Sequence, residues 1–242
     1  MDNVGYVALS AQVALRRSLD VTANNVANMN TAGYKADRTV FAEALARSGS
    51  AVPTPSAPSF AVDKHSWTDF SDGAVRETGA LLDFAVSGRG FFGVETPEGI
   101  AYTRDGRFLL GPDGALLTRD GLPVLDAGGG PLVLPRGAAE VSVAKDGTVS
   151  VNGNPAGRIG VFDGDGFQAM RKTGEGRFVS SVELEPMDSP VVLQGMVEDS
   201  NVNGVAEMTR LIDVTRAYGS AEAIADTADK LARSAVERIG RA

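Results

Sequence analysis

Residues 211–239 of this chain read LIDVTRAYGSAEAIADTADKLARSAVERI, and this stretch predicts one long helix with an uninterrupted seam of apolar side chains. Alternate steps of three and four residues, the spacing of a coiled-coil seam, meet no charged side chain along it. The seam positions are Leu211, Val214, Tyr218, Ala221, Ala225, Ala228, Ala232, Ala235 and Ile239, and Ile224 and Leu231 widen the seam on one side. At 1.5 Å per residue such a seam is on the order of 43 Å long, so we expect it to need a long partner.

The start of the chain offers a matching helix, from about Asn3 to Asn28. Apolar and small residues recur there at a mean spacing of about 3.6, the period of an amphipathic helix. This stripe consists of Val4, Ala8, Ala11, Leu15, Leu19, Thr22 and Val26. Because chain ends fray unless something holds them, we expect both ends to be buried, against each other or against neighbouring copies. That pattern favours assembly over catalysis, although a terminal helix folded back on its own domain is the structural alternative.

The composition is that of a globular protein. A chain of 242 residues with 43% hydrophobic and 22% charged residues can bury a real core. Its net charge of −8 and the lack of a basic run argue against nucleic-acid binding. Cysteine is absent, which excludes disulfides and thiolate sites. No apolar run has the length of a membrane span, and the first residues lack the basic and apolar regions of a cleaved secretory signal.

The middle of the chain, from about Leu82 to Pro186, predicts an antiparallel β domain. Short apolar runs alternate there with Asp-Gly pairs, which are strong hairpin signals. Thr103-Arg104-Asp105-Gly106 recurs as Thr118-Arg119-Asp120-Gly121, and we interpret the two as similar hairpin turns. The predicted fold class is therefore α+β: terminal amphipathic helices pack as a coiled-coil-like core, and an antiparallel β domain is inserted between them.

Four segments follow from these patterns. We expect a short helical piece from Lys35 to Leu45, and a loop or loose arm in the Pro- and Ser-rich stretch at residues 46–62. The predicted segments are an N-terminal helix with its Asn-rich end at 1–34, a connector at 35–81, the β domain at 82–186, and a connector strand with the C-terminal helix at 187–242.

No constellation of residues supports catalysis. Residues 88–93, GRGFFG, satisfy the letters of a dinucleotide-binding loop, but that loop must open a helix, and here a strand and a hairpin are predicted to follow. The single histidine, His65, and the absence of cysteine leave neither a Ser-His-Asp site nor a zinc site enough parts. We expect no enzyme activity, no cofactor, no metal and no small-molecule substrate.

The end of the first predicted helix, ANNVANMNTAGYK at residues 23–35, holds more asparagine than an ordinary cap needs. Asparagine side chains bond local backbone, and we interpret Gly33 as the glycine that ends the helix. The stretch resembles the motif of the bacterial flagellar rod and hook axial-protein family, an Asn-rich helix end followed by Asn-Thr-x-Gly-Phe/Tyr-Lys. The matching residues are Asn24, Asn25, Asn28, Asn30, Thr31, Gly33, Tyr34 and Lys35.

The far end of the chain resembles the same family. Residues 200–231 are similar to its C-terminal motif, as are GRGFFGV and AYTRDGRF to its central region, so the resemblance covers almost the whole chain. The C-terminal matches are Ser200, Asn201, Val202, Asn203, Glu207, Met208, Arg216, Ala217 and Tyr218. Gly219 departs from the family, which usually carries an acidic residue there; glycine costs about 1 kcal/mol of helix propensity.

The resemblance implies a structural subunit of the flagellar basal-body rod, exported without a cleaved signal through the flagellar type III apparatus and polymerised in the periplasm. The implied partners are copies of itself and other proximal and distal rod proteins; contact with the surrounding rings is left open. The two apolar stripes would form the subunit-packing interface. The sequence at Met1-Asp2-Asn3 and Tyr6-Val7-Ala8 favours the proximal rod, with the distal rod as the nearest alternative. A self-contained β-rich binding module, for instance for a glycan, is the alternative from another class.

Overall fold

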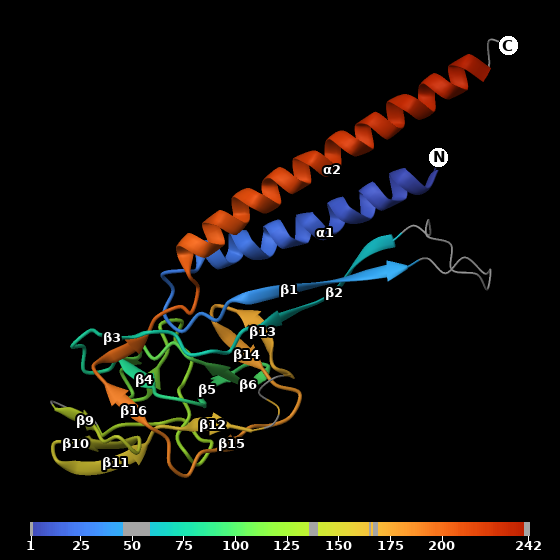
Figure 1. Cartoon of the computed structure of the whole chain (residues 1–242). Coiled ribbons are helices and arrows are strands. Elements are labelled where there is room, and N and C mark those ends of the chain that lie inside the picture. Colours follow the sequence, from blue (N-terminus) through green and yellow to red (C-terminus); the bar gives the residue numbers. More distant parts are fainter. Residues whose placement is uncertain (1, 46–58, 136–139, 165, 167–168, 240–242) are drawn as a thin grey trace. The chain divides into compact units, whose positions relative to one another are not determined.

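The computed structural model describes residues 2–45, 59–135, 140–164, 166 and 169–239. Its two helices lie at the two ends of the chain and antiparallel strands lie between them, so the predicted fold class is confirmed (Figure 1). The chain divides into two compact units, each built from separate stretches. Unit 1 comprises Met1–Ala27, Asp37–Asp69 and Asn203–Ala242, and unit 2 comprises Asn28–Ala36 and Phe70–Val202.

Unit 1 contains both helices and one hairpin. Helix α1 (Asp2–Ala27) and helix α2 (Gly204–Ile239) lie side by side, and the start of α1 points toward the same end of the unit as the end of α2 (Figure 1). Strands β1 (Asp37–Leu45) and β2 (Ser59–Thr68) pair in antiparallel fashion and lie against α1. Both predicted helices are therefore present. Gly219 does not interrupt α2, and the space around its Cα is open.

The helical piece expected at residues 35–45 is wrong, because this stretch forms strand β1. Thr39, Val40 and Phe41 are β-branched or aromatic and favour an extended backbone. Their partner strand β2 begins only at Ser59, so local sequence patterns do not reveal the pairing. Most of the Pro- and Ser-rich stretch, residues 46–58, lies outside the described residues.

Unit 2 is an assembly of short strands, and every pairing among its described strands is antiparallel. The largest sheet has the order β13-β14-β6-β5-β12-β15, a second has the order β11-β10-β9, and β16-β4, β17-β3 and β7-β8 form pairs. The strands are β3 (Val75–Glu77), β4 (Phe84–Val86), β5 (Phe91–Thr96), β6 (Gly99–Thr103), β7 (Leu109–Leu110), β8 (Leu116–Leu117), β9 (Val141–Val143), β10 (Thr148–Val151), β11 (Asn154–Arg158), β12 (Val161–Asp163), β13 (Arg171–Gly174), β14 (Arg177–Val179), β15 (Glu185–Pro186), β16 (Val192–Gln194) and β17 (Met196–Glu198).

Strand β5 is buried on both of its faces. Neighbouring residues of a strand point to opposite faces, yet Phe91 and Phe92 are both fully buried. Phe92 belongs to the main apolar core and packs edge-to-face with Phe108 at 5.2 Å between ring centroids. Phe91 belongs to a second core and packs with Phe178 at 5.8 Å. Residues 88–93, which we predicted not to be a dinucleotide-binding loop, thus lead into β5. This strand contributes side chains to both apolar cores of unit 2 and forms a hairpin with β6.

The Asp-Gly pairs are only partly hairpin turns. Those at 113–114 and 146–147 join β7 to β8 and β9 to β10, as predicted. Asp105-Gly106 is not a hairpin turn, because β6 ends at Thr103 and pairs with β5 and β14. A Cβ on Gly106 would lie 1.7 Å from the Phe84 carbonyl oxygen, so glycine is required there by close backbone packing. The two Thr-Arg-Asp-Gly stretches therefore differ in structure.

Candidate functional site

The seam of α2 faces the interior of unit 1. Among the predicted positions with described side chains, Ala221 is buried, and the remainder are partly buried: Leu211, Val214, Tyr218, Ala225 and Ala228. Glu207, one seam step before Leu211, is also buried. The predicted seam spacing is thus reproduced by the burial of α2 as far as Ala228. The side chains of Ala232, Ala235 and Ile239 lie outside the described residues.

The flanking positions of the seam behave differently. Ile224 is 55% exposed and Leu231 is 63% exposed. Beyond Ala228, every described side chain of α2 is exposed. Further exposed apolar side chains of unit 1 are Leu9 and Val13 on α1 and Val205, Met208 and Ile212 on α2. The outer surface of unit 1 therefore carries apolar groups that the described part of the subunit does not cover.

The buried face of α1 is smaller and more polar than the predicted stripe. Ala8 is buried as expected, while Ala11, Leu15, Leu19 and Val26 are partly buried, and the side chain of Val4 lies outside the described residues. The most buried of the described side chains of the helix are Ala8, Ala14, Ser18, Thr22 and Asn25. The predicted apolar stripe does not include the polar Ser18 and Asn25, and only the Asn-rich motif marked Asn25.

Asn25 is the residue of the Asn-rich motif that joins three elements of unit 1. Its amide brackets Asp37 at the start of β1: Nδ2 donates to the Asp37 carbonyl oxygen at 2.9 Å, and Oδ1 accepts from the Asp37 N–H at 3.0 Å. Nδ2 also lies 3.4 Å from Oε2 of Glu207 on α2. Arg38 donates to the other carboxylate oxygen of Glu207 at 2.8 Å. Helices α1 and α2 and strand β1 are therefore joined by one partly buried polar cluster.

The other asparagines near the helix ends make local hydrogen bonds or are exposed. Asn28 accepts a hydrogen bond from the Thr31 hydroxyl at 3.2 Å, whereas Asn24 and Asn30 are exposed. Asn203 caps α2, because its Oδ1 accepts from the N–H of Ala206 at 3.1 Å. The prediction that Gly33 ends the helix is wrong, since α1 ends at Ala27. Gly33 has φ +67°, and a Cβ on it would lie 2.3 Å from the Asp105 nitrogen, so it permits a close backbone approach instead.

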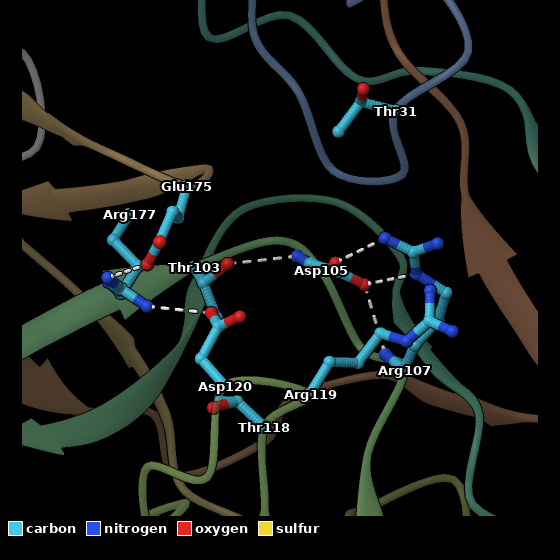
Figure 2. A pocket seen from close by; sticks show the side chains of 9 residues that line it. All are labelled: Thr31, Thr103, Asp105, Arg107, Thr118, Arg119, Asp120, Glu175 and Arg177. Atoms are coloured by element: carbon cyan, nitrogen blue, oxygen red, sulfur yellow. Dashed lines mark hydrogen bonds and ion pairs between the residues drawn. The ribbon is translucent and has the colours of Figure 1, made fainter.

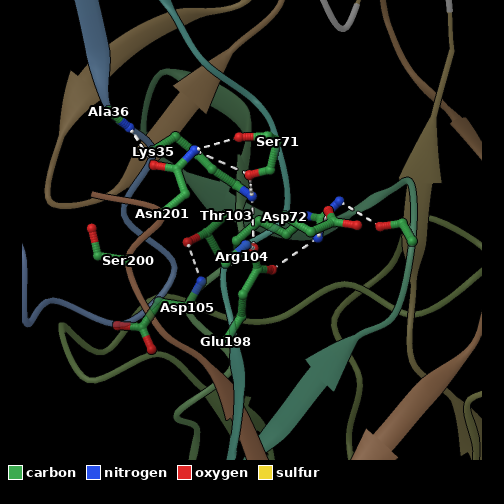
Figure 3. A network of polar contacts seen from close by, with 12 residues as sticks. Lys35, Ala36, Ser71, Asp72, Thr103, Arg104, Asp105, Glu198, Ser200 and Asn201 are labelled. Atoms are coloured by element: carbon green, nitrogen blue, oxygen red, sulfur yellow. Dashed lines mark hydrogen bonds and ion pairs between the residues drawn. The ribbon is translucent and has the colours of Figure 1, made fainter. Parts of the chain in front are cut away.

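Unit 2 holds a buried charge network around Glu198, at the end of β17 (Figure 3). Lys35 Nζ donates to Glu198 Oε1 at 2.6 Å, and Arg104 Nη1 donates to Oε2 at 2.8 Å. The three side chains are 0%, 2% and 1% exposed for Lys35, Arg104 and Glu198. The Gly73 N–H donates to Glu198 Oε1 as well, at 2.8 Å. Each of these three partners donates a hydrogen bond, so both oxygens of the Glu198 carboxylate are occupied.

The network shifts the ionisation of both of its ends. Burial lowers the pKa of Lys35 below its ordinary value, even though Glu198 acts in the opposite direction. Burial by itself would raise the pKa of Glu198, but the charges of Arg104 and Lys35 and their hydrogen bonds outweigh it and hold that pKa below its ordinary value. Glu198 is therefore a buried anion stabilised by two buried cations.

The two family motifs meet in this network, although they lie about 165 residues apart in the sequence. Asn201 Oδ1 accepts from the Ala36 N–H at 2.8 Å, and its Nδ2 donates to the Ser71 carbonyl oxygen at 3.1 Å. The Gly33 N–H donates to the Glu198 carbonyl oxygen at 2.7 Å. The ring of Tyr34 lies 4.1 Å from the ammonium of Lys172. Residues 33–36, at the end of the Asn-rich motif, and residues 198–201, at the start of the C-terminal motif, thus hold each other within unit 2.

The remaining matches of the C-terminal motif lie just before α2 or on it. Ser200 accepts from the Val202 N–H at 3.2 Å, and Val202 is partly buried. Met208, Arg216 and Ala217 are exposed on α2.

Unit 2 also carries a pocket of about 380 Å³ (Figure 2). Its lining is polar and comes from both Thr-Arg-Asp-Gly stretches, the Asn-rich turn and the β13–β14 turn. The lining residues are Thr31, Thr103, Asp105, Arg107, Thr118, Arg119, Asp120, Glu175 and Arg177. A hydrogen bond from its side chain to Asp105 raises the pKa of Arg107, so that ion pair is firmly held. The three acids of the pocket, Asp105, Asp120 and Glu175, are each paired with an arginine.

Within the described residues, no group of three or more His, Cys, Asp and Glu side chains is placed to hold a metal ion. In the same part of the chain, neither helix is both long and apolar enough to cross a membrane.

The chain matches three flagellar family descriptions along its length. Residues 6–35 match "Flagella basal body rod protein", residues 85–151 match "Flagellar hook protein FlgE/F/G D1 domain", and residues 193–238 match "Flagellar basal body rod FlgEFG protein C-terminal". These regions contain the Asn-rich motif, the strands around β5 and the seam of α2.

Individual relatives align over nearly their whole length. The flagellar basal-body rod protein FlgF of Caulobacter vibrioides is 40% identical, with 100% of this chain and 99% of the relative covered. FlgF of Rhizobium meliloti is 37% identical, with 97% of each covered. The flagellar basal-body rod protein FlgG of Bacillus subtilis is 29% identical, with 96% of this chain and 97% of the relative covered.

Proposed function

The chain belongs to the flagellar basal-body rod protein family, and from that premise we propose how it performs the work of a rod subunit. It is a structural subunit of the bacterial flagellar basal-body rod, of the FlgF-like type. Its role is mechanical: a rod transmits torque, so its subunits must resist shear at the surfaces where they meet. We propose that it has no catalytic activity of its own.

We propose that the outer face of α2 is where neighbouring subunits pack. The observation that carries this proposal is the exposure of Ile224 and Leu231, 55% and 63%, beside a seam whose described side chains, up to Ala228, are buried or partly buried. Full burial of such a side chain is worth about 1.5–3 kcal/mol, so leaving both in water is unfavourable unless another surface covers them. In this proposal, the seam residues up to Ala228 pack within unit 1 itself. The flanking residues Ile224 and Leu231, and the seam positions after Ala228, pack against a neighbouring subunit.

The proposal extends to partners and location. The neighbours are copies of this chain and other rod proteins, and a non-closing head-to-tail contact between copies builds a filament. The subunit leaves the cytoplasm through the flagellar type III apparatus without a cleaved signal and is assembled in the periplasm. Identity of 40% and 37% to the two FlgF relatives, against 29% to FlgG of Bacillus subtilis, favours the proximal rod over the distal rod.

The test is complementation of a strain whose own copy of this gene is deleted. The chain as it stands should restore swimming. Leu231→Asp should restore neither rods nor swimming, because it places an unpaired charge in the contact. Ala223→Asp adds the same charge at an exposed position on the polar side of the same helix and should swim. Normal swimming with Leu231→Asp would contradict the assigned face, and failure of the unaltered chain would contradict the function.

A further inference from the structure

The pocket of unit 2 contains a cation that the fold leaves unused. Arg119 lines it, is exposed, and makes no hydrogen bond or ion pair with any described residue. The other two arginines of the pocket are engaged. Arg107 donates to Asp105 through Nε at 2.8 Å and Nη2 at 2.6 Å, and Arg177 pairs with both Asp120 and Glu175.

The acceptors of the pocket are correspondingly occupied. Asp105 also accepts from the Arg107 N–H at 3.1 Å, so its carboxylate meets three donors of one residue. The Thr103 hydroxyl donates to the Gly176 carbonyl oxygen at 3.1 Å, and the Thr31 hydroxyl donates to Asn28 at 3.2 Å. The Thr118 hydroxyl accepts from the Leu122 N–H at 3.1 Å. The charged group that the preformed pocket offers to an anionic ligand is therefore the guanidinium of Arg119, with five N–H donors in a planar fork.

The charge of the pocket selects among anions. Three arginines and three carboxylates line it, so its formal charge is already balanced before anything binds. A doubly charged phosphate would meet those three carboxylates without a surplus of cations to offset them. A single carboxylate is a weaker charge and matches one guanidinium through two parallel hydrogen bonds. The pocket is therefore suited to a carboxylate.

We propose that this pocket receives the side-chain carboxylate of an aspartate or glutamate from a second copy of this chain, held by Arg119. The inference rests on the proposed function, because a rod requires copies to dock. The chain has 31 acidic and 23 basic residues and a net charge of −8, so two copies repel each other as they approach. Their contacts need local sites where opposite charges meet, and a facing copy presents carboxylates more often than cations.

The functional arm of the test compares Arg119→Glu with Arg171→Glu in the deletion strain. Both arginines are exposed residues of unit 2 without a described ion pair, so neither change removes an ion pair within the described part of the chain. We expect Arg119→Glu to lose rod assembly and swimming and Arg171→Glu to retain both. Equal swimming by the two variants would overturn the pocket while leaving the proposed function intact. Failure of the unaltered chain would overturn the proposed function itself.

The chemical arm identifies the occupant. A carbodiimide joins an amine to a carboxylate only where the two are in contact, so basal bodies carrying Arg119→Lys are treated with it and digested for mass spectrometry. Before digestion we expect a product of twice the subunit mass, and after digestion of that product a peptide pair in which residue 119 is joined to an aspartate or glutamate. Arg171→Lys should give no such link from residue 171. Links from residue 119 only within one chain, or none, would overturn the proposal.

Discussion

The buried network around Glu198 makes a sharp prediction about the stability of unit 2. In Glu198→Gln the shape of the side chain is kept, but Lys35 and Arg104 lose the anion they share. All three described partners of the carboxylate are donors, so the amide group of glutamine must turn its own N–H atoms toward one of them. Removing one partner of a buried ion pair costs about 3–5 kcal/mol, a large share of the roughly 5–15 kcal/mol that stabilises a domain.

A neighbouring residue provides the matched control. Asp199 has the same chemistry, but its ion pair with Arg76 is solvent-exposed, so Asp199→Asn should cost about 0–1 kcal/mol. A second control also removes one of the cations that lose their anion. The double variant Lys35→Met with Glu198→Gln should lose less unfolding free energy than the sum of the two single variants, by about 0.5–3 kcal/mol.

The assay must report on unit 2 alone. The single tryptophan, Trp67, belongs to β2 of unit 1, so its fluorescence is unsuitable. Hydrogen exchange of amides in β5, followed by mass spectrometry over a urea series, measures the free energy of opening where unit 2 is most buried. Equal losses for Glu198→Gln and Asp199→Asn, or strict additivity in the double variant, would refute the role assigned to the network.

Three further predictions concern contacts within unit 1 and within unit 2. Asn25→Ala leaves the N–H and the carbonyl of Asp37 without their hydrogen-bond partners and should destabilise unit 1 by about 1–3 kcal/mol in urea unfolding followed by Trp67 fluorescence. The exposed Asn30→Ala should cost under about 0.5 kcal/mol, and equal costs contradict the role of Asn25. Gly33→Ala should cost about 3 kcal/mol by hydrogen exchange of unit 2, because it combines a left-handed backbone with a 2.3 Å clash, and Gly79→Ala, at φ +70° in open space, only about 1–2; no difference refutes the clash. The pKa of Glu198 is held below its ordinary value of 4.5, so the stabilisation that its carboxylate provides is complete above that pH and is lost as the pH falls through the lower folded-state pKa. The urea midpoint of unit 2 should therefore drop on acidification. This part of the drop should vanish in Glu198→Gln.

Local sequence patterns predicted those parts of the fold that depend on residues close together in the sequence. The α2 seam from Leu211 to Ala228 faces inward as its spacing requires, and the Asp-Gly turns at 113–114 and 146–147 close hairpins. The strand at residues 37–45 was missed because its partner strand β2 begins only at Ser59, far outside any local sequence window. Asp105-Gly106 has the letters of a hairpin turn, but its glycine is required by the Phe84 carbonyl against it, a contact that no sequence window contains.

The candidate site divides in the same way. The resemblance marked Lys35, Asn25 and Glu207, yet nothing in the sequence says that a lysine is fully buried or which acid faces it. Glu198 and Arg104 lie outside the quoted motif matches and acquire their role only when residues 163 and 94 positions apart in the chain are brought together. Ser18 and Asn25 are buried on α1 although both are polar, and an apolar pattern does not identify buried polar side chains.

The most direct measurement of the central claim, that the flanking face of α2 is covered by a neighbouring subunit, is cysteine accessibility. The chain has no cysteine, so Leu231→Cys and Ala223→Cys each introduce a single thiol. Both positions are exposed in the subunit, and both variants should react rapidly with a maleimide as dilute purified protein. In isolated basal bodies, Leu231→Cys should become protected while Ala223→Cys remains reactive. Equal reactivity of Leu231→Cys in the free subunit and in the basal body would contradict the account.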